Sequence, residues 1–371
     1  MTFSDTLLKW YDEHRRNLPW RGLHDAYRVW VSEIILQQTR IDQGIGYYHR
    51  FVETFPDIYA LATASEDEVL RVWQGLGYYS RARNMHETAR NIVANHGGSF
   101  PQSSAKLIKL KGIGEYTAAA LASIVFNENV PALDGNVYRV LARIFAVPHS
   151  IDTSPGKKTF RELAMQLMPD KRPGEFNQAL MDFGSMVCKP VNPLCNDCIF
   201  QDQCLALQKQ SVDKYPVRNI KRKVRERYFN YFLFQTNGPA GEPCFFIQKR
   251  TGNDIWKNMY ELPLLETSSQ LSEEEIFTNP WWKALFPAEK DVLIGKITPP
   301  MLHQLTHQRI HARLIHLKIS SGDAKILRNR FRLTDNEGFN ELPKPRLIEM
   351  LVMQADEMPT GTKISDCNIQ T

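Results

Sequence analysis

Hydrophobic residues recur at helical spacing through the first 209 or so positions of the chain. In the segment DAYRVWVSEIILQQ, the apolar residues Tyr27, Val31, Ile34 and Ile35 fall three or four positions apart, which places them on one face of a helix. Asp25 precedes them and is a suitable N-cap. Similar patterns indicate further helices at 65–76, 82–98, 136–147 and 157–168.

The pattern changes after residue 211. Residues 211–227 are polar and strongly basic, whereas 227–236 and 244–250 are aromatic and β-rich and are joined by the turn-like sequence NGPAGEP. A third strand is expected at 312–320. The sequence therefore predicts an all-α domain, a linker, an α+β domain and a polar tail, with the boundaries 1–211, 212–226, 227–353 and 354–371.

Composition restricts the class of protein. The chain has 371 residues, of which 43% are hydrophobic and 23% charged, as in ordinary globular proteins of two or three domains. Charged residues interrupt the amphipathic first 20 residues, and no uncharged apolar run approaches the roughly 18 residues of a spanning helix. We therefore expect neither a signal peptide nor a membrane span. The net charge of +5 permits a polyanionic partner without requiring one.

The segment LKGIGEYTAAA contains two glycines within three residues, Gly112 and Gly114. Both are expected to tolerate positive φ and close backbone approach. A helix that begins just after them presents free peptide N–H groups, which are suited to a phosphate. A plain corner between two helices accounts for the same spacing equally well.

Four of the six cysteines lie in the segment CKPVNPLCNDCIFQDQC. Six, two and five residues separate Cys188, Cys195, Cys198 and Cys204. Four thiolates on a short irregular loop suit a tetrahedral zinc or a four-iron cluster. Two disulfides are the less favoured alternative in a chain of this kind.

Several of these segments together resemble one family. The glycine hairpin, the motif LDGNV at 133–137 and the cysteine run resemble the helix-hairpin-helix iron–sulfur DNA glycosylases. The segments SEIILQQT and GLGYYSRARN are similar to those of the A/G-specific adenine DNA glycosylases. The resemblance covers most of residues 1–210, in the family's order.

The resemblance implies two helical lobes around a DNA cleft and one [4Fe-4S] cluster held by the four cysteines. It implies base excision repair, in which a monofunctional enzyme removes adenine mispaired with 8-oxoguanine or guanine in duplex DNA. The protein would then be a monomer without membrane association, cytoplasmic and close to the nucleoid if its source is bacterial.

The C-terminal domain resembles the Nudix hydrolases through the segment IWKNMYELPLLE. The following TSSQLSEEEIF lacks the Nudix pattern of metal-binding residues. We therefore expect a module that recognises 8-oxoguanine without hydrolysing nucleotides.

The resemblance assigns chemical roles to two carboxylates. Glu33 is the expected acid, because its neighbours on a helix are mostly apolar and would raise its pKa. Asp134 is expected to support the cationic sugar, and Asn136 to orient the site. Without the resemblance, Glu33 would be an exposed helical glutamate and Asp134 an N-cap; capping N–H groups would also keep Asp134 ionised.

Tyr116 occupies the position at which the lyase relatives of this family carry a lysine. A phenol cannot form an imine with the sugar, so we expect an abasic product with an intact backbone. Its hydroxyl would bond to Asp134 or to the sugar. The alternative is that Tyr116 only packs at the start of its helix.

Substrate contacts follow from the same matching of positions. The adenine pocket is expected to be lined by Trp20, Arg21 and Leu36, with Gln178 reading the base edge. Gln38 and Tyr78 would enter the duplex near 8-oxoguanine, with Gln37 as the alternative to Gln38. Further DNA contacts are expected from Thr39, Leu76, Gly112 and Gly114. Where relatives often have proline beside the hairpin, this chain has Lys111, which would add a phosphate contact.

In the C-terminal domain, Thr306 and His307 are expected at the tip of the loop that recognises 8-oxoguanine. The family often has Phe-Ser-His where this chain has Leu-Thr-His at 305–307. Spacing of four between His303, His307 and His311 suggests a metal site only weakly, because no acidic residue accompanies them.

Two other functions share part of this pattern. An endonuclease III-like glycosylase/lyase for oxidised pyrimidines would carry lysine at position 116 and lack the second domain. A non-catalytic iron–sulfur DNA-binding regulator would have no need of Glu33 and Asp134 at matched catalytic positions.

Overall fold

The computed structural model describes residues 2–219, 224–287 and 293–357. These residues form two compact units, one within 1–64 and 83–221 and the other within 65–82 and 222–371. Residues 358–371 of the predicted tail and 220–223 of the predicted linker lie outside the described residues. In the part of the chain that is described, every helix is too short or too polar to cross a bilayer.

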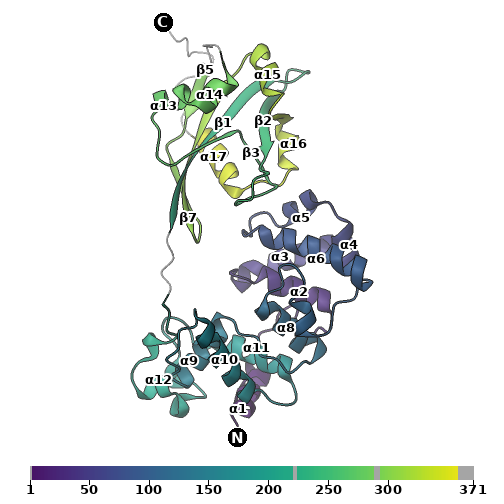
Figure 1. Cartoon of the computed structure of the whole chain (residues 1–371), viewed down its shortest axis with the longest axis vertical. Coiled ribbons are helices and arrows are strands. Elements are labelled where there is room, and N and C mark those ends of the chain that lie inside the picture. The colour runs from purple at the N-terminus through teal and green to yellow at the C-terminus, as the bar shows by residue number, and fades with distance from the viewer. Residues whose placement is uncertain (1, 220–223, 288–292, 358–371) are drawn as a thin grey trace. The chain divides into compact units, whose positions relative to one another are not determined.

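The first unit is helical (Figure 1). Asp25 caps its second helix as expected, because its carboxylate accepts from the backbone N–H groups of Tyr27 and Arg28 at 2.9 and 3.2 Å. The helices, including α6 whose first residues belong to the second unit, are α1 (Phe3–His14), α2 (Ala26–Ile35), α3 (Ile41–Thr54), α4 (Ile58–Thr63), α6 (Ser80–His96), α7 (Ser104–Leu107), α8 (Glu115–Phe126), α9 (Gly135–Ile144), α10 (Ser154–Leu167), α11 (Pro173–Met186) and α12 (Leu205–Gln208). Short 3-10 turns are η1 (Cys195–Asp197), η2 (Gln201–Gln203) and η3 (Val212–Lys214).

Small residues allow the central helices of this unit to pack closely. The alanines of α8 are buried against α2 and α11. On α11, a Cβ added to Gly184 would lie 2.7 Å from the Cβ of Asn136, so only glycine fits there. Helices α9 and α11 thus approach closely beside the motif LDGNV.

The basic stretch after residue 211 begins as part of the first unit. The backbone N–H of Ile151 donates to the carbonyl of Val217 at 3.1 Å. The buried Arg143 donates to the carbonyl of Tyr215 at 3.3 Å. Strand β1 already begins at Arg225, so the segment between the two units is shorter than its composition suggests.

The second unit combines a mixed sheet with short helices (Figure 1). Strand β1 pairs in parallel with β7 and antiparallel with β2 and β4. The path through the sheet runs β3-β2-β1-β7-β5, with β6 on β7 and β8 on β2. The strands are β1 (Arg225–Asn237), β2 (Pro243–Lys249), β3 (Tyr260–Glu261), β4 (Leu264–Thr267), β5 (Leu293–Ile297), β6 (Met301–Gln304), β7 (Gln308–Lys318) and β8 (Arg332–Asp335).

One face of β1 contributes aromatic side chains to a hydrophobic core. Phe232 and Phe234 pack in one hydrophobic core with Trp282 and with residues of the neighbouring short helices, and α17 packs on β7. The helices of this unit are α5 (Glu66–Val72), α13 (Glu273–Thr278), α14 (Pro280–Leu285), α15 (Ser321–Leu327), α16 (Asn336–Asn340) and α17 (Arg346–Glu357). The predicted α+β character of this region is confirmed.

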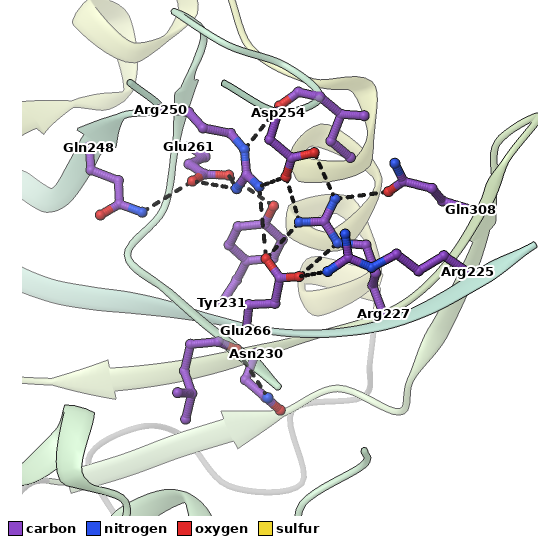
Figure 2. A network of polar contacts seen from close by, with 12 residues as sticks. Arg225, Arg227, Asn230, Tyr231, Gln248, Arg250, Asp254, Glu261, Glu266 and Gln308 are labelled. Atoms are coloured by element: carbon purple, nitrogen blue, oxygen red, sulfur yellow. Dashed lines mark hydrogen bonds and ion pairs between the residues drawn. The ribbon is translucent and has the colours of Figure 1, made fainter. Parts of the chain in front are cut away.

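A partly buried ionic network lies at the start of β1 (Figure 2). Arg227, whose side chain is 2% exposed, contacts Asp254 and Glu266 at 2.6 Å each. Arg250 contacts Asp254 at 2.7 Å and Glu261 at 3.1 Å. With Arg225 near Glu266 at 3.8 Å, three cations face three carboxylates. Pairing with opposite charges offsets part of the desolvation cost of burying Arg227, Arg250 and Glu261.

Candidate active site

Glu33 on α2 and Tyr116 on α8 face each other across the packed helices. The Tyr116 hydroxyl donates to Glu33 Oε2 at 2.7 Å and approaches the sulfur of Met181 at 3.5 Å. The Tyr116 hydroxyl was expected to bond to Asp134 or to the sugar; in this structure, which contains no DNA, its hydrogen goes to Glu33. The small side chains of α8 allow Tyr116 to lie close to α2. Its hydroxyl bonds there to the carboxylate of Glu33.

Burial raises the pKa of Glu33, as its apolar surroundings predict. The hydrogen bond from Tyr116 and the charge of Arg21 lower this pKa, and the charge of Asp134 raises it. The pKa of Tyr116 lies well above its usual value, chiefly through burial. Glu33 is thus a carboxyl group that can hold a proton closer to neutral pH than an exposed glutamate can.

Asp134 is the N-cap of α9. Its Oδ1 accepts from the backbone N–H groups of Asn136 and Val137 at 2.9 and 2.8 Å, and its Oδ2 accepts from the side-chain amide of Asn136 at 2.6 Å. Burial raises the pKa of Asp134, and these donors oppose the increase. Capping alone was expected to keep Asp134 ionised; desolvation is the larger influence on its pKa.

Asn136 is itself held in place from the other side. Arg139 donates to Asn136 Oδ1 at 2.8 Å, to the carbonyl of Gly184 at 2.7 Å and to the carbonyl of Cys188 at 2.7 Å. One guanidinium therefore joins the amide beside Asp134 to the start of the cysteine loop.

The residues expected to line the adenine pocket lie in this unit. The side chain of Arg21 donates to the Tyr11 hydroxyl at 3.2 Å, and Tyr11 donates to Gln178 Oε1 at 2.8 Å. Trp20 is buried and packs edge-to-face on Tyr48, with their ring centroids 5.0 Å apart. Leu36 is the half-buried C-cap of α2.

The glycine hairpin leads from α7 into α8. Gly112 has φ +76°, and a Cβ there would lie 2.6 Å from that of Asn84. Gly114 is the N-cap of α8 with φ −84°, so the tolerance of glycine for positive φ is used at Gly112 and not at Gly114. No side chain caps the start of α8, which leaves its first N–H groups available. Lys111, for which a phosphate contact was expected, forms an ion pair with Glu87 in this structure.

The two glutamines after α2 differ in their surroundings. Gln37 donates to the Thr117 hydroxyl on α8 at 3.2 Å. Gln38 is exposed and has φ +62°, a left-handed backbone that is unusual for a residue with a Cβ. Thr39 beside it is half-buried.

The four clustered cysteines are free thiols that line one cavity with Ile144, Phe183 and other apolar side chains. Burial raises the pKa of the thiols of Cys188, Cys195 and Cys198. Among the described residues, no group of histidine, cysteine and acidic side chains is arranged around a single metal ion. Four thiols around a shared cavity are a donor set that suits a metal ion or an iron–sulfur cluster.

One buried arginine supports this cavity. Arg143 donates to Cys188 Sγ at 3.5 Å and to the carbonyls of Lys189 and Pro190 at 2.7 and 3.2 Å. An N–H donor beside a sulfur stabilises thiolate charge. The donor set thus suits an anionic sulfur cluster.

Comparison with known proteins agrees with this geometry. Residues 31–169, which include Glu33, the glycine hairpin and Asp134, match the HhH-GPD superfamily base excision DNA repair protein family. The adenine DNA glycosylase of Rattus norvegicus is 34% identical over an alignment of 357 positions that covers 82% of this chain and 69% of the relative. The chain belongs to the adenine DNA glycosylase family. The enzyme of the same name from Buchnera aphidicola subsp. Acyrthosiphon pisum is 34% identical over 282 residues, covering 75% of this chain and 79% of its own.

A solved structure also resembles the chain. A thermostable thymine-DNA glycosylase superposes with a TM-score of 0.52 at 28% identity, covering 56% of this chain and 95% of its own. The helical glycosylase fold expected of the family is therefore confirmed. The thymine-DNA glycosylase is thus matched over little more than half of this longer chain.

The remaining residues that the family resemblance singles out belong to the second unit. Tyr78 is 44% exposed with φ +49°, and its hydroxyl contacts that of Thr306. His307 is exposed beside Thr306, whereas Leu76 is buried. Tyr78 is thus not an aromatic residue of the hydrophobic core.

The other histidines of this loop have partners of their own. His311 contacts Glu226 at 2.8 Å, and His303 packs near Trp256. No metal site forms from them within the described residues.

Sequence reasoning missed several polar residues of this site. Tyr11, Asp182, Arg139 and Arg143 all contact predicted site residues or the groups that hold them. Nothing in their spacing distinguishes them from ordinary helical positions. Only the burial of charged side chains, seen in three dimensions, identifies them.

Proposed function

We propose that the protein removes adenine from duplex DNA by hydrolysing the bond between the base and deoxyribose. One observation carries this proposal: the buried Glu33 carboxyl, which accepts from Tyr116, lies in the same helical unit as the carboxylate of Asp134, which is held at the start of α9. A proton donor and a carboxylate are the two groups that glycosidic hydrolysis needs. Membership of the adenine DNA glycosylase family names the base.

The reaction follows from these two side chains. A base flipped out of the duplex into the site takes the proton of Glu33 and leaves with the electrons of its glycosidic bond. The ionised Asp134 stabilises the cationic sugar. A water oxygen then bonds to C1′, and the proton that it loses returns to the Glu33 carboxylate.

Tyr116 limits the chemistry to hydrolysis. It offers a phenol where a lyase needs an amine, so no imine with the sugar can form. The product is an abasic site in an intact strand.

Recognition of the opposite base is assigned to the residues around Tyr78. The contact between the hydroxyls of Tyr78 and Thr306 supports a shared site for 8-oxoguanine, or for guanine. The exposed, left-handed Gln38 suits entry into the duplex better than Gln37, which is bonded to Thr117. The uncapped N–H groups at the start of α8, beside Gly114, suit a DNA phosphate.

The four cysteines would hold one [4Fe-4S] cluster. When bound, it supplies iron–thiolate bonds that fix an irregular loop. Arg143 and Arg139 position this loop in the protein itself, through the sulfur and the carbonyl of Cys188. The protein is expected to act as a monomer on DNA.

One experiment separates the alternatives. The purified protein is incubated with duplexes that contain an 8-oxoguanine:adenine pair, a guanine:adenine pair or an oxidised pyrimidine, and the products are resolved with and without hot alkali. We expect cleavage of the adenine strand only after alkali. Cleavage at the pyrimidine without alkali would indicate a glycosylase/lyase, and binding without any cleavage would indicate a regulator.

A further inference from the structure

We infer that Tyr11 and Asp182 fix the orientation of the Gln178 side-chain amide, so that its Nε2 donor faces the base pocket. This inference rests on the proposed function, because it concerns how adenine is read. It assigns a positioning role to two residues outside the predicted site.

Donor and acceptor capacity sets the direction of the whole chain of bonds. Asp182 is fully buried and accepts from Arg16 Nε at 3.2 Å and from Arg21 Nη2 at 2.8 Å. A guanidinium has hydrogens to donate and no lone pair to accept. Arg21 is therefore the donor in its hydrogen bond to Asp182, and this bond holds the Arg21 guanidinium in place.

The same argument orients Tyr11. Arg21 Nη1 donates to the Tyr11 oxygen at 3.2 Å, so this oxygen acts as an acceptor. The hydroxyl hydrogen of Tyr11 remains, and it is donated to Gln178 Oε1 at 2.8 Å. In the flipped amide, Nε2 would also donate to the Tyr11 oxygen, and the buried hydroxyl hydrogen would have no acceptor among its described contacts.

Two donors are then left for a ligand. Gln178 Nε2 makes no hydrogen bond among those of the described residues, although only 8% of the residue is exposed. Arg21 Nε is buried and also lacks a partner in the described part of the chain. A wall with two free N–H donors suits a base edge that carries acceptors. The ring nitrogens N1, N3 and N7 of adenine are such acceptors, and its exocyclic amine is a donor.

The matched alternative is that Tyr11 only fills space in the hydrophobic core of α1 and α11. Tyr27 provides the control for this alternative. It is also a buried tyrosine, and its hydroxyl donates to the carbonyl of Phe55 at 2.6 Å. Tyr27→Phe removes a buried hydrogen bond of the same kind that is not part of the chain from Asp182 to Gln178.

The test measures binding of the full-length protein to duplexes with adenine, 1-deaza-, 3-deaza- or 7-deazaadenine opposite 8-oxoguanine. The target sugar carries a 2′-fluorine, which disfavours the sugar cation and prevents cleavage. For the native protein and Tyr27→Phe, we expect at least one deaza analogue to bind about tenfold more weakly than adenine. In Tyr11→Phe this ratio should fall below about threefold, because the amide is free to flip.

Gln178→Ala tests the same ratio without relying on Tyr11. For the analogue that lacks the acceptor of Gln178, the ratio should be close to one in Gln178→Ala, and Tyr11→Phe should have no further effect on it in the double variant. If the ratio of every penalised analogue persists in Gln178→Ala, Gln178 reads no ring nitrogen, which overturns the inference even if Tyr11→Phe does not fold. An undiminished ratio in Tyr11→Phe, or no penalised analogue in the native protein, also overturns it. If the native protein does not excise adenine at all, the proposed function fails instead.

Discussion

At Glu33, burial and hydrogen bonding act in opposite directions on one proton. Burial raises its pKa, and the hydroxyl of Tyr116 lowers it. An acid catalyst works best with a pKa near the working pH, because it must hold the proton before the reaction and release it during the reaction. The pair formed by Glu33 and Tyr116 is suited to this compromise.

Replacing either carboxylate by its amide should stop the reaction and preserve the fold. For Glu33→Gln and for Asp134→Asn we expect single-turnover rates of adenine removal to fall at least about 10²-fold, with affinity for the duplex within about threefold. Asn is as good an N-cap as Asp, so α9 should persist in the second variant.

Glu115→Gln is the matched control for these variants. Glu115 is adjacent to Tyr116 but exposed, and it pairs with Arg161 at 2.6 Å. Its amide variant should remove adenine at the native rate. Native rates in Glu33→Gln or Asp134→Asn would remove that residue from the mechanism.

The pH dependence of excision should report the hydrogen bond from Tyr116. Glu33 acts while protonated, so the rate should fall as the pH rises through its raised pKa. Tyr116→Phe removes a donor that stabilises the carboxylate, so this pKa should rise further and the basic limb of the profile should move to higher pH. Single-turnover rates between about pH 5 and 9 measure the shift. A limb that stays in place or moves to lower pH would contradict the role given to Tyr116.

At the scale of elements, the network at Arg227 connects strand pairing with the recognition loop (Figure 2). Arg227 donates to Gln308 Oε1 at 2.8 Å, and the backbone N–H of Arg225 donates to the carbonyl of His307 at 3.0 Å. The loop 305–307 is therefore held at its end by β1. Its tip remains exposed for a base.

Gln308→Leu should loosen this loop without removing a group from its tip. We expect the preference for 8-oxoguanine:adenine over guanine:adenine to fall about three- to tenfold, whereas the maximum rate on the better substrate stays near native. Gln308→Glu keeps an acceptor for Arg227 and should retain the preference. Equal preference in the native protein and Gln308→Leu would show that the anchor is not needed for recognition.

The cysteine loop has little regular structure of its own. It contains only the short turns η1 and η2, so its shape depends on Arg143 and on whatever the thiols bind. Cys198→Ala should therefore lose the iron absorbance of the protein and most of the folded yield. Iron analysis and a thermal melt measure both effects. Cys244→Ala, in the second unit, is the control, and a soluble, active Cys198→Ala protein without iron would contradict the proposed cluster.

Long amphipathic elements could be predicted from the sequence, and short ones could not. The periodicity around Tyr27 and the cap at Asp25 indicated α2, and the aromatic run from 227 indicated β1. Strands β3, β4, β6 and β8 have two to four residues, which is too few for a periodic pattern. They form because their backbones hydrogen-bond to the longer strands β1, β2 and β7.

The polar contacts of the site depend on residues that are distant in sequence. Tyr11 and Gln178 are 167 positions apart, and Tyr116 and Glu33 are 83 positions apart. Motif resemblance could name Glu33 and Gln178 as candidates. It could not show that Tyr116 bonds to Glu33, or that Tyr11 orients Gln178.

For the whole molecule, the two units predict separable functions. A chain that ends at Val224 keeps Glu33, Tyr116 and Asp134 but lacks Thr306 and His307. We expect this chain to remove adenine while distinguishing 8-oxoguanine from guanine poorly. Its melting temperature should also fall, because residues 65–82 lose partners such as Lys249, which contacts Asp67 at 2.8 Å.

Single-turnover rates on both mispairs measure this separation. Full-length Thr306→Val, which loses only the hydroxyl, is the control that distinguishes the loop from the rest of the unit. An unchanged preference in the truncated chain would refute a recognition role for the second unit.

The left-handed backbones of Gln38 and Tyr78 bear on how this protein can evolve. A residue with a Cβ in that conformation destabilises the free protein, and glycine would relieve the strain. Selection for heat resistance alone would thus favour glycine at both positions and would remove the side chains that are expected to enter the duplex. These two positions therefore set a limit on how stable the protein can become while it still repairs DNA.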